Sequence, residues 1–487
     1  MCQTERIVMK SVSLVSVSAS LVSLALAVSL SACGSGTPSS ASSEGIHRNE
    51  PIALLTADER LERQEAPHDV IVQLFNWPFQ KITAEIPTLA AQGYGQVHVS
   101  PPNLSIASDQ WWGRYQPVDY RLIAGPLGNE TEFRAMITKA HAHGIKIIID
   151  IVFNHTANPS SPYPAEAAQI AATQGELFQA IDYHKAACIQ NYNDLDQVRN
   201  DRICVGNGDQ GLPDLDQNSS RVLNAQHAFL QRLTAMGVDG YRFDAVKHME
   251  PDYFKKLLTD DVAKGKFIFG EIIADSSSFD RDISPYLATK TMGFYDFPLR
   301  STIQSAFSPG GSLADLVDTE LVSKKRGMPA GTGVGFVMNH DIPNNDGFRS
   351  MILDPVDEDL AYAYLLGREG TTPYVYSDLG LAGGGGIRDE RWNHAHRSPK
   401  LVSLVKFHNA VAGQPMKVIA ANKCLIAFQR GSIGVMLINK CEIEEVVSLD
   451  GRLGDDIELR EVFEGTTYRS SESITVPGRS SLALIVR

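Results

Sequence analysis

Positive charge is scarce in this sequence. Its 487 residues carry 44 lysines and arginines against 57 aspartates and glutamates, which gives a formal net charge of −13 at pH 7. Nucleic-acid binding relies on clustered basic side chains, and because no such cluster occurs here a nucleic-acid partner is not expected. No segment repeats at a fixed period, so a repeat architecture is not expected either. The length suits a large domain joined to a smaller one.

A long, strongly apolar run is also missing. Residues 12–30 follow Lys10 but are interrupted by serines, so they are too weakly apolar for a membrane-spanning helix. The run closes in LSAC, which resembles the lipobox of bacterial lipoproteins and ends at Cys33. We therefore predict a signal peptide over 1–33, a lipid anchor on Cys33 and a flexible tether over 34–68. The protein would be exported and held by the membrane at the bacterial cell surface or in the periplasm. An ordinary secretory signal with a free cysteine is the alternative.

Cysteine is used sparingly, at six positions. Beyond the N-terminal segment an even number remains, which in an oxidising compartment predicts disulfides. These cysteines are Cys188, Cys204, Cys424 and Cys441. The last two lie on neighbouring strand-like runs separated by a glycine turn, so a bridge across that hairpin is plausible. Four buried free thiols are the alternative.

The stretch GVDGYRFDAVKH, residues 237–248, begins like a strand because it is rich in β-formers. Arg242 and Asp244 are two residues apart, so their side chains point to the same side. The arginine favours an ionised Asp244, as a nucleophile requires. A purely structural ion pair is the alternative.

Other apolar runs also end in polar residues. They are 145–155, ending in Asp150, Asn154 and His155; 266–272, ending in Glu271; and 334–341, ending in Asn339, His340 and Asp341. Successive strands of a closed barrel deliver their C-terminal ends to one face, so these side chains are expected to meet there.

Several of these stretches together resemble the alpha-amylase family of glycoside hydrolases. The matching motifs, in family order, are DIVFNH (150–155), LPDL (212–215), GYRFDAVKH (240–248), GEI (270–272) and NHD (339–341). The resemblance covers the chain from about residue 69 to its end. VSPPN (99–103), WWGRYQPVDY (111–120) and NYNDLDQVRND (191–201) are similar to the animal-type members.

The strand pattern and the resemblance predict an α/β fold. Its catalytic part is a (β/α)8 TIM barrel over 69–398, with an insertion subdomain at about 156–215 after the third strand. After it, short strands with tight turns predict an antiparallel β-sandwich over 399–487.

The resemblance implies roles for three carboxyl groups. Asp244 matches the nucleophile, Glu271 the acid/base, and Asp341 a third carboxylate that favours the transition state. The apolar neighbours of Glu271 favour its protonated form near neutral pH. The enzyme would then retain anomeric configuration, with the first two carboxyls about 5–5.5 Å apart.

Aromatic residues near the second strand suit a sugar substrate, because sugar rings present apolar C–H faces. The cluster consists of Trp111, Trp112 and Tyr115, beside the amide of Gln116. Two adjacent tryptophans are more often packing anchors, but the matching family aromatics stack on glucose. Further substrate contacts are implied for His155, Arg242, Lys247, His248 and His340.

The resemblance also implies a structural calcium ion. Asn154 and Asp214 match ligands through side-chain oxygens, and Arg199 and His248 match positions that donate backbone carbonyls. An all-oxygen set suits this hard cation. A disulfide between Cys188 and Cys204 matches one in the animal-type branch.

Two departures from the animal-type pattern stand out. Those enzymes hold a chloride ion with two arginines and an asparagine, of which Arg242 and Asn339 are present. Pro373 or a neighbour occupies the third position, so chloride binding is not expected, although Arg368 lies five residues upstream. In place of a glycine-rich loop the chain has IPNNDGFR, residues 342–349.

We therefore expect a monomeric, exported, endo-acting alpha-amylase that hydrolyses α-1,4 bonds in starch, glycogen and maltooligosaccharides. A maltogenic amylase, an α-glucosidase or a transglycosylase on the same scaffold is the alternative. A glucan-binding surface lipoprotein without turnover is less favoured, because all three carboxylates are present.

Overall fold

The computed structural model describes residues 69–159, 164–204, 210–379 and 389–487. The predicted signal peptide, Cys33 and the tether lie outside the described residues. Among the residues that are described, none forms a helix long and apolar enough to cross a membrane.

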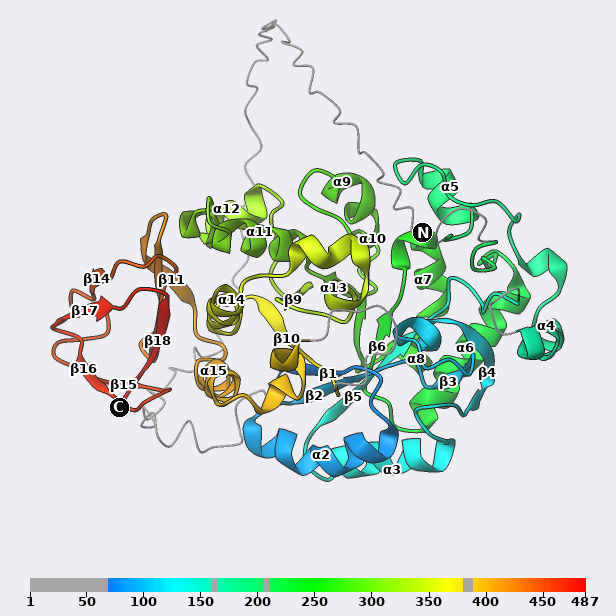
Figure 1. Cartoon of the computed structure of the whole chain (residues 1–487), viewed down its shortest axis with the longest axis horizontal. Helices are drawn as coiled ribbons and strands as arrows, with labels where there is room; N and C mark the ends of the chain where they lie inside the picture. The colour runs from blue at the N-terminus through cyan, green and yellow to red at the C-terminus, as the bar shows by residue number, and fades with distance from the viewer. Residues whose placement is uncertain (1–68, 160–163, 205–209, 380–388) are drawn as a thin grey trace, which may run out of the picture. The chain divides into compact units, whose positions relative to one another are not determined.

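Eight parallel strands form a closed barrel, as the sequence predicts (Figure 1). Each strand pairs with its neighbour in chain order, and the first and last strands pair to close the ring. The strands are β1 (Ile71–Leu74), β2 (Gln96–Val99), β5 (Lys146–Ile151), β6 (Gly240–Phe243), β7 (Phe267–Gly270), β8 (Gly293–Tyr295), β9 (Gly333–Phe336) and β10 (Thr371–Ser377).

Amphipathic helices surround the barrel. In α2 (Phe79–Gln92), the side chains of Phe79, Ile82, Ile86 and Leu89 recur every three or four residues and are buried. This helix ends at Gly93, whose φ of 91° suits glycine. The other principal helices are α3 (Glu130–His141), α6 (Ser220–Ala235), α7 (Pro251–Leu257), α8 (Asp260–Ala263), α11 (Phe297–Phe307), α14 (Pro355–Gly367) and α15 (Pro399–Ala410).

The insertion after β5 contains α4 (Pro164–Leu177), η2 (Ala180–Asp182) and α5 (Leu195–Asn200). It returns to the barrel where Leu215 N donates to Asn154 O at 2.9 Å and Thr156 N donates to Pro213 O at 3.0 Å. The predicted bridge between Cys188 and Cys204 is present, with a Cα–Cα distance of 5.7 Å. The LPDL stretch is thereby fixed at the end of β5.

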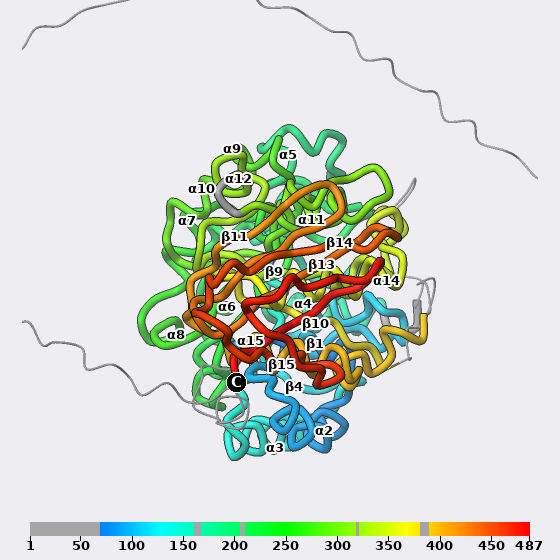
Figure 2. The backbone as a smooth tube through the Cα atoms, turned by 90° about the vertical axis from the view of Figure 1, so that its left-hand side faces the viewer, coloured from blue at the N-terminus to red at the C-terminus, as the bar shows by residue number. Residues whose placement is uncertain are grey.

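The C-terminal strands, drawn in orange and red in Figure 2, form two antiparallel sheets. The two sheets share an apolar core. One sheet has six strands: β11 (Met416–Ala421), β12 (Leu425–Arg430), β13 (Gly434–Asn439), β18 (Ser480–Val486), β15 (Glu458–Glu461) and β16 (Thr467–Arg469). The other pairs β14 (Glu445–Ser448) with β17 (Ser473–Val476). Helix α15, which the sequence pattern placed with these strands, packs against α14, α2 and β18.

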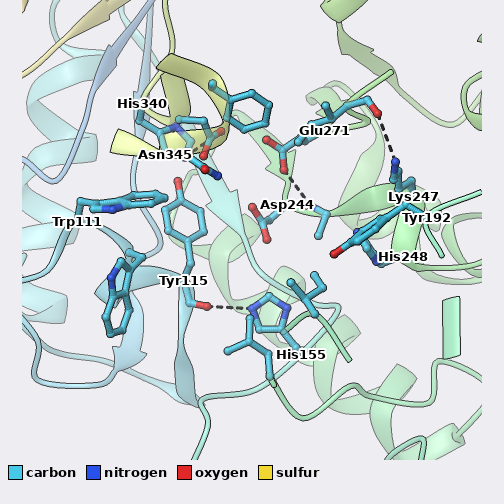
Figure 3. A pocket seen from close by; sticks show the side chains of 17 residues that line it. Trp111, Tyr115, His155, Tyr192, Asp244, Lys247, His248, Glu271, His340 and Asn345 are labelled. Atoms are coloured by element: carbon cyan, nitrogen blue, oxygen red, sulfur yellow. Dashed lines mark hydrogen bonds and ion pairs between the residues drawn. The ribbon is translucent and has the colours of Figure 1, made fainter. Parts of the chain in front are cut away.

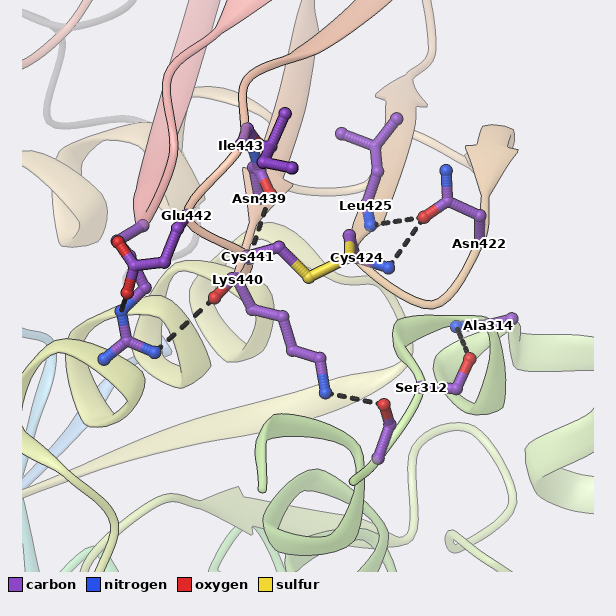
Figure 4. Close-up of a disulfide and its surroundings, with 12 residues drawn as sticks. Ser312, Ala314, Asn422, Cys424, Leu425, Asn439, Lys440, Cys441, Glu442 and Ile443 are labelled. Atoms are coloured by element: carbon purple, nitrogen blue, oxygen red, sulfur yellow. Dashed lines mark hydrogen bonds and ion pairs between the residues drawn. A yellow bond between two sulfur atoms is a disulfide. The ribbon is translucent and has the colours of Figure 1, made fainter. Parts of the chain in front are cut away.

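The β12–β13 hairpin is bridged by Cys424 and Cys441, as predicted, with a Cα–Cα distance of 5.2 Å (Figure 4). Next to this bridge, Lys440 reaches the barrel. Its Nζ donates to the carbonyl oxygens of Ala306 at 2.5 Å, Ser308 at 3.0 Å and Gly311 at 2.7 Å. These carbonyls lie at the C-terminal end of α11, where a cation is favoured by the helix dipole. The lysine therefore joins the β-sheets to the barrel.

Candidate active site

A pocket of about 420 Å³ is lined by residues that follow the C-terminal ends of the barrel strands (Figure 3). This is the face on which barrel enzymes place their active sites. Its lining consists of Trp111, Trp112, Tyr115, His155, Tyr192, Ile203, Leu212, Asp244, Ala245, Lys247, His248, Glu271, Ile273, His340, Asp341, Asn345 and Phe348. The strand ends thus converge as predicted.

Arg242 lies beneath the pocket and joins two of its carboxyl groups. Its guanidinium is fully buried; Nη1 donates to Asp244 Oδ1 at 2.7 Å, and Nη2 lies 2.7 Å from Glu271 Oε1. The second contact is a close ion pair without hydrogen-bond alignment, because Nη2 has no hydrogen-bond partner. The two nitrogens belong to one guanidinium group, so the carboxyl groups of Asp244 and Glu271 are held next to each other.

Burial changes the expected charge of Asp244. It raises the pKa of this carboxyl to about 8, with the negative charges of Glu271 and Asp150 adding to the effect and Arg242 opposing it. The pKa of Asp341 is raised well above its ordinary value by burial and by the charge of Glu271. The prediction that Arg242 keeps Asp244 ionised was therefore incomplete, because it ignored burial and the neighbouring carboxylates. The carboxyl groups of Asp244 and Asp341 therefore ionise less readily than free carboxyl groups.

Asp150 contacts two residues of the site, Arg242 and Tyr115. Its carboxylate is fully buried and accepts hydrogen bonds from Arg242 Nη1 and from the Tyr115 hydroxyl, both at 2.8 Å. Burial raises the pKa of Asp150, but Arg242 and His98 outweigh burial and bring the pKa below the ordinary value. Asp150 is therefore an anion that fixes both Arg242 and Tyr115.

The pocket histidines are held in place and neutral. His340 stacks on Tyr115 with ring centroids 5.2 Å apart, and its Nδ1 lies 2.8 Å from Gln73 Nε2. His155 Nε2 donates to Tyr115 O at 2.9 Å. Burial lowers the pKa of His155 to about 4 and that of His340 well below its ordinary value. Neutral imidazoles can exchange hydrogen bonds with sugar hydroxyls.

The pocket has two sides. Figure 3 shows Trp111, Tyr115 and His340 on one side, and Lys247, Tyr192 and His248 on the other, with Asp244 between them. The Lys247 ammonium lies 5.9 Å from the centre of the Tyr192 ring. Each of these residues except Tyr192 was predicted from the sequence.

Two predicted substrate residues do not line the pocket. Gln116 turns away, because its Oε1 accepts a hydrogen bond from Asn158 N at 3.1 Å. Arg242 lies below the surface of the pocket and contacts carboxyl groups instead. Sequence reasoning missed Tyr192, Asn345 and Phe348, which do line it. The signal available for Tyr192 was the animal-type stretch that contains it, whereas Asn345 and Phe348 lie in the stretch that departs from that type.

The four predicted calcium ligands belong to segments that meet beside the pocket. Asp214 forms an isolated β-bridge with His155, which follows β5. His248 Nδ1 donates to Val198 O at 2.8 Å. This hydrogen bond brings α5, which carries Arg199, against η3 (Val246–His248). The long insertion, β5 and the loop after Asp244 therefore converge here.

Two oxygens in this cluster suit a cation. The Oδ1 atoms of Asn154 and Asp214 are buried and have no hydrogen-bond partner. Burial raises the pKa of Asp214 to about 6, with His184 opposing. A hard cation would satisfy both oxygens. Within the part of the chain that the structure describes, no three His, Cys, Asp or Glu side chains form a metal-binding group, so such a site would depend on the amide and on backbone carbonyls.

Known proteins share this architecture. Residues 79–281 match the family model described as the alpha amylase catalytic domain. The alpha-amylase of Aeromonas hydrophila is 40% identical over 409 residues, which cover 78% of this chain and 86% of the relative. That of Thermomonospora curvata is 30% identical over 462 residues, covering 86% and 73%.

A solved structure agrees with the sequence matches. Alpha-amylase I of Eisenia fetida superposes with a TM-score of 0.68 at 25% identity, covering 85% of this chain and 94% of that one. The similarity extends over most of each protein and includes the barrel whose strand ends carry Asp244, Glu271 and Asp341. The chain therefore belongs to the alpha-amylase family of glycoside hydrolases, whose members hydrolyse α-1,4-glucosidic bonds, and it is an enzyme of that kind.

Proposed function

We propose that this enzyme cleaves glucan chains internally and with retention of configuration. The observation that carries the proposal is the single guanidinium of Arg242 in contact with both Asp244 and Glu271 at the floor of one pocket. Retaining glycosidases require two carboxyl groups this close to each other.

The chemistry follows in two steps. An Asp244 carboxylate oxygen attacks the anomeric carbon, the bond to the leaving oxygen breaks, and Glu271 gives its proton to that oxygen. A water molecule then attacks the same carbon, Glu271 takes the water proton, and the bond to Asp244 breaks. Asp341 lies in the same pocket and would bind sugar hydroxyls during both steps.

The first step needs a proton on Glu271 and a charge on Asp244. Asp244 keeps the aligned hydrogen bond from Arg242 Nη1, whereas the contact of Arg242 with Glu271 lacks that alignment. A hydrogen bond to the charged form favours that form. The aligned hydrogen bond therefore favours the anion on Asp244, although burial raises the pKa of that carboxyl to about 8, so the reactive state forms when Asp244 loses its proton.

The substrate would lie across the pocket. Trp111, Trp112 and Tyr115 offer aromatic faces on one side, and His155 and His340 offer neutral imidazoles near the catalytic centre. Lys247 and His248 would bind the sugars on the reducing-end side of the cleaved bond.

The chain lengths of early products test the internal mode of cleavage. Soluble starch digested to a few per cent should give a mixture of maltooligosaccharides, and iodine staining should fall much faster than reducing ends appear. Glucose or maltose as the only early product would contradict internal cleavage and would favour an α-glucosidase or a maltogenic amylase.

We expect catalysis to be independent of chloride. Asn339 and Arg242 are both fully buried, and Arg242 contacts the acid/base. Arg368 lies before β10 instead, where its guanidinium bonds Thr371 and lies 5.7 Å from the centre of the Tyr364 ring. A buried anion with one cationic partner is poorly compensated for its lost hydration. Activity in chloride-free buffer should stay within about twofold of that with sodium chloride at equal ionic strength. Severalfold activation by chloride over nitrate would contradict this.

We also propose that the protein is exported, monomeric and anchored by a lipid on Cys33, with the barrel, its insertion and the C-terminal β-sheets beyond a flexible tether. The two disulfides are bonds typical of an oxidising compartment. Several acyl chains hold a bacterial lipoprotein firmly, because each buried CH₂ adds about 0.8 kcal/mol.

Cys33→Ser should therefore move the protein from the membrane fraction to the soluble fraction of the cells that produce it. Fractionation followed by immunoblotting measures the change. Cys2→Ser serves as the matched control and should leave the distribution as it is. Membrane association that persists in Cys33→Ser would count against lipidation.

A further inference from the structure

The segment that follows Asp341 forms one wall of the substrate pocket. It folds into α13 (Asp341–Asn344) and η5 (Asp346–Met351), and it contributes Asn345 and Phe348 to the pocket lining. Phe348 N donates to Asn345 O at 2.9 Å, so the two residues belong to one short turn. Figure 3 places Asn345 beside His340, on the side of the pocket that holds Trp111.

Helix α11 holds both ends of this wall. Arg300 on that helix is fully buried; its Nε donates to Val337 O at 2.5 Å and its Nη2 donates to Met351 O. Val337 precedes the wall and Met351 closes it. One turn further along the helix, Gln304 Nε2 donates to Ser350 O at 2.6 Å. Two side chains of one helix therefore fix the start and the end of the segment.

A second, partly buried cluster of side chains contacts the residues that follow the wall. Arg391 Nη2 donates to Leu353 O at 3.2 Å and lies 3.6 Å from Glu358 Oε2. Trp392 Nε1 donates to the other carboxylate oxygen of Glu358 at 2.9 Å, and the Arg391 guanidinium lies 4.8 Å from the centre of the Trp392 ring. The chain after β9 is thus joined to the chain after β10 before any substrate is present.

We propose that Phe348 and Asn345 bind the glucan chain next to the catalytic subsite, and that Arg300 is a positioning residue that keeps this wall in its binding conformation. The proposal rests on the α-glucan pocket described above. Phe348 is only partly buried and packs against the core, so part of its ring remains for the C–H face of a glucose unit. The exposed Asn345 amide can bond a sugar hydroxyl. Because folding has already ordered the wall, substrate binding does not bear that entropic cost.

The expected consequence is an effect on binding rather than on the chemical step. An aromatic contact contributes roughly two- to tenfold in affinity. Phe348→Ala should therefore raise the KM for maltoheptaose by roughly that factor and change kcat less than about twofold. Phe348→Tyr, which keeps the ring, should restore the KM. The matched control is Arg349→Ala, the next residue in the chain, which does not line the pocket.

The positioning role of Arg300 is tested by a mutant cycle. Arg300→Lys keeps the charge but cannot reach both carbonyl oxygens, so it should raise the KM in the wild-type background. In a background that carries both Phe348→Ala and Asn345→Ala it should add little, because the contacts that it positions are already gone. If Arg300→Lys does not fold, Gln304→Ala, which removes only the bond to Ser350, takes its place. A melting curve of each variant shows that it is folded.

Two outcomes would overturn the inference. One is a folded Phe348→Ala variant whose KM for maltoheptaose stays within twofold of the wild-type value. The other is a full, independent effect of Arg300→Lys in both backgrounds, which would remove its positioning role. Product profiles from the same incubations judge internal cleavage separately, so an exo-acting wild type with a Phe348-dependent KM would contradict the proposed function and leave this inference standing.

Discussion

Asp244→Asn is expected to lower kcat for soluble starch by roughly 10⁴-fold or more, while the affinity for maltooligosaccharides stays near that of the wild type. Loss of one member of a catalytic group that acts as a unit has effects of this order. The amide has nearly the shape of the carboxylate and can still accept the hydrogen bond from Arg242 Nη1, but it cannot form the glycosyl ester. Initial rates and calorimetric titration with maltoheptaose measure the two quantities.

A matched control separates this effect from a general loss of acidic side chains. Asp252 lies in α7, is exposed and forms an ion pair with Lys255 of the same helix. Asp252→Asn should keep the wild-type kcat. If Asp244→Asn kept more than a tenth of the wild-type kcat after purification from a host without amylase, Asp244 would not be the nucleophile.

We propose a structural calcium ion at Asn154 and Asp214, and its removal is expected to lower the melting temperature by roughly 5 °C. A ligand at a thousand times its Kd stabilises the native state by about 4 kcal/mol, which corresponds to a shift of this order in a protein of this size. The physical reason is the pair of buried oxygens on Asn154 and Asp214, which have no hydrogen-bond partner without a cation. Differential scanning calorimetry before and after prolonged EDTA treatment, and again after calcium is restored, measures the shift.

Variants of two neighbouring aspartates make the test specific. Asp214→Asn should melt near the temperature of the EDTA-treated wild type and should respond little to the chelator. Asp216→Asn changes a half-buried carboxylate nearby, whose closest charged contact is His184 Nε2 at 3.5 Å, and should keep the full response. An unchanged melting temperature of the wild type after long chelation would rule out a structural ion.

The barrel strands were predictable because their signals are local. Runs such as 147–149 and 267–270 are continuously apolar, as strands covered on both faces must be, and the polar residues that follow them mark the ends. Parallel strands in a closed barrel point the same way. The gathering of Asp244, Glu271 and Asp341 at one face therefore follows from the order of the strands alone.

Other features depend on contacts between distant segments and were decided only by the tertiary structure. The amide of Gln116 lies in the right loop for a substrate contact, yet the insertion supplies Asn158 N and turns its side chain away. Helix α15 packs against α14, α2 and β18, and no local pattern shows these contacts between distant segments. The raised pKa of Asp244 likewise arises from burial and from carboxylates on other strands.

The conformation of the wall at Asn345 and Phe348 was likewise decided by the tertiary structure and not by its local sequence. Its sequence indicated only that a glycine-rich loop was absent, and nothing local pointed to a partner for it. Arg300, 37 residues before Val337, supplies the buried hydrogen bonds that give the segment one conformation. The sequence by itself determined which elements form and which strand ends carry the reactive groups, because these depend on periodicity and chain order. Which side chains face the substrate, and in which charge state, was decided by burial and by hydrogen bonds between segments far apart in the chain, which only the folded structure brings together.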